Sequence, residues 1–463
     1  TKTAMSRGEE RAMKALSPLD QSFLMLERRN QPMHVGGLLL FTPPPGATPA
    51  DIRELVEGMR TNEDVQPPFN QRLTRKLGLP FWTEDEEFDL AHHFRHLALP
   101  QPGRIRELLA MVSNLHSSLL DREFPLWETT FIEGVSDGRF AIYNKMHHAM
   151  VDGVASIRLT EAILSPDPEA RSMAPPWAVK RPSRKPAGIV AGPTSAISSA
   201  MGQIKAQAKS WPAVTKALVG TYKQARKEPE FGALFQAPTT LFNRRIGNAR
   251  RFAAQSWPIA RVRGVGKKLG CTINDVVLGM CSAALRRYLQ EQNALPSKPL
   301  ITMMPMSLRR DDSDSGNQVG MVLANLGTHI ADPAERLGLI KRSVQASKQR
   351  LSQMTPAEIM NYTALISGPA GLNLAMGLAP EKQLYNVVIS NVPGPKQTLY
   401  WNGARMEGMY PVSIPVDGMA LNITLVSYGD QLNFGLIACR RSVPHVQRML
   451  EYLEQGLAEL ESL

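Results

Sequence analysis

The strongest chemical signal in the sequence is a pair of histidines followed by an aspartate and a glycine. Residues 147–153 read His-His-Ala-Met-Val-Asp-Gly. A histidine can accept a proton near neutral pH, as a hydroxyl group requires when its oxygen attacks a carbonyl carbon. Asp152 could hold the loop through its carboxylate, and Gly153 permits a tight turn. The histidine pair alone would fit two packed histidines and a helix cap, but the aspartate and glycine at this spacing favour a catalytic loop.

Two other groups of residues resemble reactive sites, and we interpret both structurally. Residues 134–138 (Gly-Val-Ser-Asp-Gly) match the hydrolase nucleophile elbow, but a strand pattern follows where that motif needs a helix, so we predict a hairpin turn. His92, His93 and His96 are close in sequence, and His92 and His96 could share a helical face. Because no matching acidic or cysteine ligands accompany them, we predict no metal site. His34 is interpreted as a core or near-site histidine and not as a catalyst.

The histidine run lies between a predicted strand and a predicted helix. Residues 127–133 and 139–146 have the apolar pattern of strands, and residues 154–164 that of a helix with Asp152 near its N-cap. A side chain at such a junction can project into a cleft. The other predicted elements are a helix opened by Ser17, helices at 49–60, 104–120, 275–290 and 443–460, and strands at 33–41, 300–304, 385–390 and 418–427. Their alternation predicts a mixed α/β fold.

The length of the chain suits two domains of roughly 200 residues each. From Pro166 to about residue 193 the chain is rich in proline, serine, lysine and arginine, as linkers are. Residues 194–227 have helical propensity with interspersed lysines, and could form a basic helix on a membrane surface or a helix packed across the domains. The predicted division is an N-terminal domain over 13–165, a linker over 166–250 and a C-terminal domain over 251–463.

Composition excludes several classes of protein. The 463 residues are 43% hydrophobic and 21% charged, which is typical of a folded globular chain. No stretch approaches the ~18 apolar residues of a membrane span, and residues 1–16 lack the apolar core of a signal peptide. We therefore expect a cytoplasmic protein whose membrane contact is peripheral. Cys271, Cys281 and Cys439 are too widely spaced for a disulfide framework or a metal motif, and are interpreted as buried thiols.

Several short motifs occur in a fixed order along the chain, and together they resemble one family. Residues 16–27 begin Leu-Ser-Pro-Leu-Asp, and residues 31–37 read Gln-Pro-Met-His-Val-Gly-Gly. Pro-Leu-Trp follows at 125–127, Asn-Asp at 274–275 and Ser-Asn-Val-Pro-Gly-Pro at 390–395. The His-His-x-x-x-Asp-Gly run is shared by the chloramphenicol-acetyltransferase-like superfamily. Within it, the ordered set resembles the bacterial wax ester synthase/diacylglycerol acyltransferase family.

The resemblance implies two α/β domains with mixed sheets flanked by helices, and an active-site channel between them. It implies transfer of a fatty acyl group from acyl-CoA to a long-chain alcohol, giving a wax ester, or to diacylglycerol, giving triacylglycerol. His148 would be the general base, with His147, Asp152 and Gly153 shaping its loop. Acyl-CoA would be a co-substrate, and no cofactor is expected. The alcohol would attack the thioester directly, without an acyl-enzyme.

The smaller motifs each allow two interpretations. Residues 272–275 fit a capping box before the apolar run that follows. Asn274 could also donate a hydrogen bond to the developing oxyanion, a contact worth about 3–4 kcal/mol in other enzymes. The Pro-Leu-Trp motif could line the substrate channel, but a turn with a buried tryptophan would give the same pattern. The predicted substrate-binding residues are Pro125, Leu126, Trp127 and Asp275.

The net charge of +11 should attract an anionic partner. The phosphates of coenzyme A qualify, as does the surface of the inner membrane or of a lipid droplet, whereas no motif indicates nucleic acid. A basic surface kept for solubility is the simpler alternative. Two rival functions are a condensation-type enzyme that uses carrier-bound thioesters and a lipid-binding protein without turnover. The 31–37 and 125–127 matches argue against the first, and the intact histidine run argues against the second.

Overall fold

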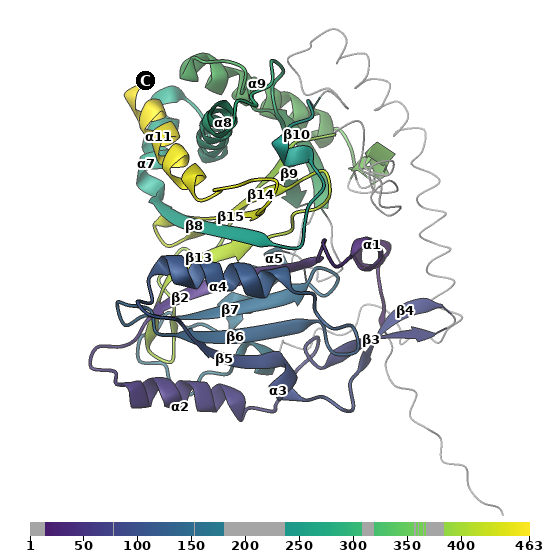
Figure 1. Ribbon diagram of the computed structural model, residues 1–463, viewed down its shortest axis with the longest axis vertical. Coiled ribbons are helices and arrows are strands. Elements are labelled where there is room, and N and C mark those ends of the chain that lie inside the picture. Colours follow the sequence, from purple (N-terminus) through teal and green to yellow (C-terminus); the bar gives the residue numbers. More distant parts are fainter. Residues whose placement is uncertain are drawn as a thin grey trace, which may run out of the picture.

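The computed structural model describes residues 14–76, 78–151, 153–179, 237–307, 319–355, 358–359, 361–363, 365–366 and 384–463. These residues form two six-stranded sheets and one three-stranded sheet, with helices packed around the larger two (Figure 1). The predicted mixed α/β class is confirmed. Asp152 and the predicted basic helix at 194–227 lie outside the described residues. The domain boundaries and the channel between the domains stay predictions.

The first large sheet carries the histidine run on a central strand. Its strand order is β12-β13-β2-β7-β6-β5, and every neighbouring pair is antiparallel except β5 with β6. The strands are β2 (His34–Thr42), β5 (Phe94–Ala98), β6 (Trp127–Glu133), β7 (Phe140–His147), β12 (Tyr400–Trp401) and β13 (Ala404–Val412). The late segment with β12 and β13 thus completes a sheet made otherwise of the first 150 residues, which the sequence did not predict.

Strand β7 is buried on both faces, as a central strand of a covered sheet is. Phe140, Ile142 and Met146 pack into one apolar cluster, and Ala141 and Tyr143 pack into another on the opposite face. The strand predicted at 139–146 is thereby confirmed. The predicted hairpin is confirmed as well, because the turn at 134–138 joins β6 to its antiparallel partner β7.

The second large sheet has the strand order β10-β9-β11-β14-β15-β8. Strand β11 runs parallel to β9 and β14, and the other neighbours are antiparallel. The strands are β8 (Arg250–Pro258), β9 (Ile301–Ser307), β10 (Val319–Asn325), β11 (Val387–Val392), β14 (Leu421–Tyr428) and β15 (Gln431–Cys439). The helices on this sheet are α7 (Ile259–Leu269), α8 (Ile273–Glu291), α9 (Pro333–Ser352) and α11 (Arg448–Ser462). They gather on one of its faces (Figure 1).

Helix α8 is the core helix of this half of the molecule, because it is buried on almost every side by its neighbours. Among the described residues no single helix is long and apolar enough to cross a membrane. Helices α7 and α8 together have the required length and composition, but the chain bends by 101° between them. The closing helix α11 begins at Arg448 and not at Val443 as predicted, because His445 adopts a left-handed backbone conformation with φ of 54°.

Helix α4 (Ile105–Ser117) joins the two large sheets, and lies between β8 and the first sheet in Figure 1. Ser117 Oγ accepts the N–H of Arg250 at 3.0 Å, and Ser113 Oγ accepts the N–H of Phe252 at 2.8 Å. Both donors belong to β8, an edge strand whose outward N–H groups need partners. The remaining elements are α1 (Pro18–Leu26), α2 (Pro49–Arg60), α3 (Leu90–His93), α5 (Gly153–Ala162), β1 (Lys14–Ala15), β3 (Gln71–Lys76), β4 (Leu79–Glu84) and the short 3₁₀ helices Pro176–Ala178 and Leu241–Asn243.

Candidate active site

The junction between β7 and α5 is held by main-chain hydrogen bonds to two other segments. The N–H of His147 donates to the carbonyl of Leu126 at 2.9 Å, and the N–H of His148 donates to the carbonyl of Met33 at 2.8 Å. Helix α5 begins at Gly153. The predicted strand-to-helix junction is therefore confirmed, and the main chain of the predicted base is fixed between the two segments.

Helix α1 places an aromatic ring on the predicted base. The ring of Phe23 stacks on the imidazole of His148, with centroids 4.2 Å apart and planes inclined by 18°. His148 itself is half-buried. Stacking on the face of the imidazole restrains its rotation and uses neither ring nitrogen, since both nitrogens lie at the edge of the ring. This arrangement suits a base whose orientation must be fixed.

The neighbouring His147 is fully buried, and both of its ring nitrogens face protein groups. Its Nδ1 accepts the N–H of Ala149 at 3.0 Å. A nitrogen that accepts a hydrogen bond carries no proton, so we assign the ring proton to Nε2. Nε2 lies 3.4 Å from Oε1 of Glu27. These contacts favour the predicted role of His147 in shaping the loop over direct contact with a substrate.

Glu27, at the end of α1, is a buried carboxylate surrounded by donors. Its Oε1 accepts the N–H of Met33 at 3.1 Å and faces His147, while its Oε2 accepts two hydrogen bonds from Arg122 at 3.0 and 2.9 Å. Burial alone would raise the pKa of Glu27, but the contacts with His147, Met33 and Arg122 outweigh it and hold the pKa below its ordinary value. The group is therefore an anion at neutral pH.

The Pro-Leu-Trp motif supports the histidine loop from behind. The carbonyl of Leu126 holds His147, and its side chain packs in one apolar cluster with Ala149. Trp127 is 1% exposed, and its Nε1 donates to the carbonyl of Phe69 at 2.7 Å. Pro125 is also buried. All three residues thus have packing roles, and their contact with substrate stays a prediction.

Residues 272–275 form the predicted capping box at the start of α8. The N–H of Asp275 donates to Thr272 Oγ1 at 3.2 Å, and the N–H of Thr272 donates to Asp275 Oδ2 at 2.9 Å. The carboxylate of Asp275 is thus engaged in the cap, and its contact with substrate stays a prediction. The side-chain amide of Asn274 donates to the sulfur of Met304 at 3.8 Å, and a thioether is a weak acceptor. The role of Asn274 toward an oxyanion stays a prediction.

A network of buried polar side chains lies beside the histidine loop. His34 pairs with His147 across β2 and β7, and its Nε2 donates to the carbonyl of His116 at 2.9 Å. Nε2 of His116 donates to the carbonyl of Ser413 at 2.9 Å, and its Nδ1 accepts the hydroxyl of Tyr143 at 2.7 Å. Burial lowers the pKa of His116 to about 3 and that of His34 well below its ordinary value. Both rings are neutral. His34 was predicted to be a core or near-site histidine, and its complete burial confirms the core position.

The prediction that His92 and His96 could share a helical face is wrong. Helix α3 ends at His93 and β5 begins at Phe94, so His92 and His96 belong to different elements. The ring of His92 stacks on Phe124 at 3.7 Å between centroids, and Nε2 of His96 lies 3.3 Å from Glu133. Within the described ranges, no three histidine, cysteine or acidic side chains gather as metal ligands do.

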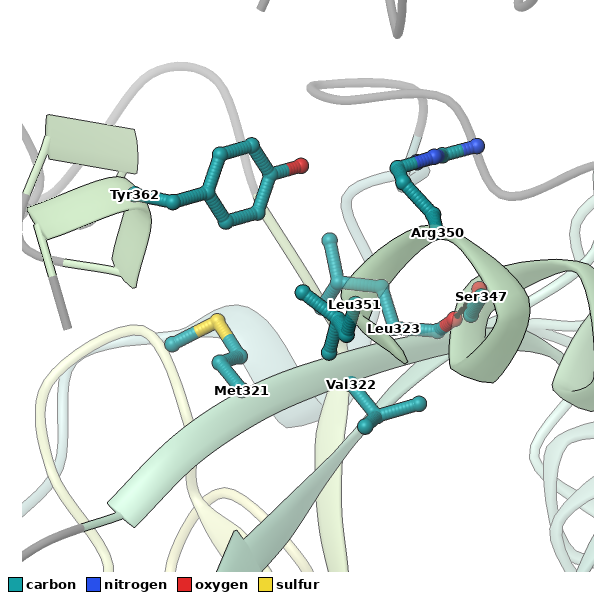
Figure 2. Close-up of a pocket in the computed structure, with 7 residues that line it drawn as sticks. All are labelled: Met321, Val322, Leu323, Ser347, Arg350, Leu351 and Tyr362. Carbon is teal, nitrogen blue, oxygen red and sulfur yellow. Dashed lines mark hydrogen bonds between the residues drawn. The ribbon is translucent and has the colours of Figure 1, made fainter. Parts of the chain in front are cut away.

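A small surface pocket lies on the second sheet, away from the histidine loop. It is lined by Met321, Val322, Leu323, Ser347, Arg350, Leu351 and Tyr362. Figure 2 shows the Tyr362 ring and the Arg350 side chain above apolar side chains of β10 and α9. None of the predicted site residues lines this pocket. The candidate site is therefore identified by the residue types and contacts of the histidine loop and not by a pocket.

The contacts of Glu27 and Phe23 with the loop, and the contact of Arg122 with Glu27, were not predicted from the sequence. Glu27 belongs to the matched 16–27 segment, but it lies 120 residues before His147, and no local pattern connects the two. The available signals were the match of the 16–27 segment to the family, which includes Phe23 and Glu27, and the presence of an acidic residue at the end of an apolar helix.

The comparisons with known proteins agree with the family resemblance. Residues 16–277 match the wax ester synthase/diacylglycerol acyltransferase catalytic domain, and residues 315–461 match the C-terminal domain of the same family. The O-acyltransferase WSD of Acinetobacter baylyi is 51% identical over 97% of this chain and 98% of its own length. A Mycobacterium tuberculosis protein provisionally named a diacylglycerol O-acyltransferase is 46% identical over 96% of this chain and 99% of its own.

Solved structures give the same result at the level of the fold. The wax ester synthase/diacylglycerol acyltransferase from Marinobacter aquaeolei matches with a TM-score of 0.77 and 48% identity, over 97% of this chain and 99% of that one. The first condensation domain of the CDA synthetase matches with a TM-score of 0.62 and 15% identity, over 97% of this chain and 95% of its own, which shows a shared fold alone. The chain therefore belongs to the wax ester synthase/diacylglycerol acyltransferase family.

Proposed function

We propose that this chain transfers a fatty acyl group from acyl-CoA to the hydroxyl of a long-chain alcohol or of diacylglycerol. Membership of the family makes the chain an acyltransferase, and the names of its relatives supply the two acceptor classes. The observation that carries the proposal is the histidine run, intact in a chain 51% identical to an O-acyltransferase and fixed at the junction of β7 and α5. Acyl-CoA is the co-substrate, and no cofactor is part of the proposal.

His148 acts as the general base in this proposal. Its imidazole takes the proton of the acceptor hydroxyl while the oxygen bonds to the thioester carbonyl carbon, which moves negative charge onto the carbonyl oxygen. When the tetrahedral intermediate collapses, the carbon–sulfur bond breaks and the imidazolium returns the proton to sulfur. Coenzyme A leaves as a thiol and the ester remains, so protons and charges balance. Such a base contributes roughly 100- to 10,000-fold in rate.

Direct attack by the alcohol, without an acyl-enzyme, is supported by the state of the cysteines. Cys281 is fully buried, and burial raises the pKa of its thiol to about 12. Burial also raises the pKa of Cys271. Burial would raise the pKa of Cys439 too, but hydrogen bonds from Ser442 and Gly247 outweigh it and lower that pKa, while the thiol itself is fully buried and cannot reach solvent. A thiol that resists ionisation or cannot reach solvent is a poor nucleophile. In the same proposal Asn274 donates to the oxyanion, and residues 125–127 back the substrate channel.

The proposed activity is tested by supplying palmitoyl-CoA with hexadecanol, with dipalmitoylglycerol or with no acceptor. We expect thiol release only when an acceptor is present, with one ester formed for each coenzyme A. Equal release without acceptor would identify a thioester hydrolase instead. Transfer from a carrier-bound thioester but not from acyl-CoA would support the condensation-type rival, and lipid binding without turnover would support a lipid-binding protein.

The net charge of +11 supports a further part of the proposal, peripheral contact with an anionic lipid surface such as the inner membrane or a lipid droplet facing the cytoplasm. We expect the protein to sediment with vesicles that contain phosphatidylglycerol, and expect raising the salt from about 50 to about 500 mM to release most of it, because salt screens surface charge. Undiminished binding to neutral phosphatidylcholine vesicles at high salt would contradict the electrostatic contact.

A further inference from the structure

Glu27 is connected, through Met33 and His147, to the main chain at the proposed base and at the residue that follows it. Its Oε1 accepts the N–H of Met33, and the carbonyl of Met33 accepts the N–H of His148. The same oxygen faces Nε2 of His147, whose Nδ1 accepts the N–H of Ala149. The two routes converge on residues 148 and 149, so one carboxylate holds the main chain at His148 and immediately after it.

The same residue also connects the loop to the helix that covers the base. Glu27 follows the last turn of α1, and its N–H donates to the carbonyl of Phe23, the residue whose ring stacks on His148. Arg122 holds the C-terminal end of α1, since its guanidinium donates to Glu27 Oε2 and to the carbonyl of Leu24. The side chain of Glu27 is 3% exposed, and burying a charge so completely is costly unless it is paired.

We infer that Glu27 is a positioning residue for acyl transfer, and that it acts through His147. The inference rests on the proposed role of His148 as the base. A carboxylate is only an acceptor, so it selects the tautomer of His147 that carries its proton on Nε2. That tautomer leaves a lone pair on Nδ1 for the N–H of Ala149. Without the carboxylate only the N–H of Ala149 still favours this tautomer, and the Nε2 proton of His147 loses the acceptor that fixes the ring.

Glu27→Gln tests the inference, because the amide keeps the size of the side chain and removes its charge. We expect kcat for palmitoyl-CoA and hexadecanol to fall about 10- to 100-fold with little change in KM, as small misplacements of a catalytic group do. Glu123→Gln, an exposed glutamate four residues before Trp127, is the matched control and should keep wild-type kcat. When His147 is already replaced by asparagine, adding Glu27→Gln should lower kcat by less than about threefold further, because the effects of two residues that act through one interaction are not additive.

A second measurement needs neither the variant nor activity. In wild-type protein labelled with ¹⁵N-histidine, NMR at neutral pH should show His147 with its proton on Nε2 and an unprotonated Nδ1. A proton on Nδ1, or unchanged kcat in folded Glu27→Gln, would overturn the inference. If the wild type lacked acyltransferase activity, the proposed function would fail, while the tautomer would still test whether His147 presents an Nε2 proton to Glu27.

Discussion

Gly36 has no side chain, and this leaves room for the buried polar network of His34, His116 and Tyr143 beside the histidine loop. A Cβ added to Gly36 would lie 2.7 Å from Cε2 and 2.8 Å from the hydroxyl oxygen of Tyr143. The hydroxyl of Tyr143 donates a hydrogen bond to Nδ1 of His116. The carbonyl of His116 accepts a hydrogen bond from Nε2 of His34. The glycine in the Pro-Met-His-Val-Gly-Gly segment is therefore explained by the close approach of a ring from the neighbouring strand.

Replacing Gly36 by alanine should destabilise the protein by about 1–3 kcal/mol, the usual cost of overpacking a filled core. Gly37→Ala is the matched control, since nothing lies within 4 Å of a Cβ added there, and it should change stability by less than about 0.5 kcal/mol. Urea unfolding followed by tryptophan fluorescence compares the two variants with the wild type. Equal stability of both variants would show that Tyr143 can move aside.

The residues of the candidate site that were predictable are those contiguous in sequence. The run at 147–153 stands out because its histidines, aspartate and glycine are neighbours in the chain. Glu27 and Phe23 reach His147 and His148 only after α1 has packed on the loop, so no spacing rule connects them. A single sequence gives the groups that carry chemistry more readily than the groups that orient them.

Helix α4 acts as an element that bridges the two sheets. The hydroxyls of Ser113 and Ser117 lie one turn apart on the helix and satisfy two N–H groups of β8. Each hydroxyl also donates to a carbonyl one turn earlier in α4, so both of its hydrogen-bonding functions are used. An edge strand of one sheet is thus paired with a helix that packs on the other.

Ser113→Ala and Ser117→Ala should each destabilise the protein by about 1–2 kcal/mol, because each leaves a strand N–H without its acceptor. Asn114→Ala is the control, since Asn114 is exposed on the same helix. Thermal unfolding measures the loss of stability, and hydrogen exchange at the amides of Arg250 and Phe252 measures the loss of their acceptors. Faster exchange at these two amides in the serine variants is expected, and unchanged exchange would show that water replaces the hydroxyls.

Elements with local signals were predicted well, and non-local pairings were not. Helix α2 has the predicted bounds, and its N-terminus is fixed by a capping box between Thr48 and Asp51. Strand β13 pairs with β2 across more than 350 residues of chain, and its register is decided by packing between distant segments. That kind of pairing leaves no periodic signal in either strand, so the first sheet could be predicted only in part.

Across the whole molecule, buried neutral histidines couple stability to pH. Burial lowers the pKa of His93 to about 4 and that of His116 to about 3. In the unfolded chain a histidine has a pKa of about 6.5, so between these values the unfolded state binds more protons. The stabilisation from these two groups is therefore complete above pH 6.5 and is lost as the pH falls toward 4.

We expect the protein to be less stable at pH 5 than at pH 7.5 by about 2 kcal/mol for each of these histidines. Urea unfolding at the two pH values measures the difference. His116→Asn should lower stability at pH 7.5 but should reduce the loss between pH 7.5 and pH 5. The same pH dependence in wild type and variant would mean that His116 is already protonated, or stays neutral, in both states.

The role proposed for His148 is that of the base in acyl transfer. It is tested most directly by coenzyme A release from palmitoyl-CoA and hexadecanol, with wild type beside His148→Ala and with His329→Ala, which removes an exposed histidine, as the control. We predict that release in His148→Ala falls at least about 100-fold while the control keeps wild-type activity. Equal release by His148→Ala and wild type would contradict this role.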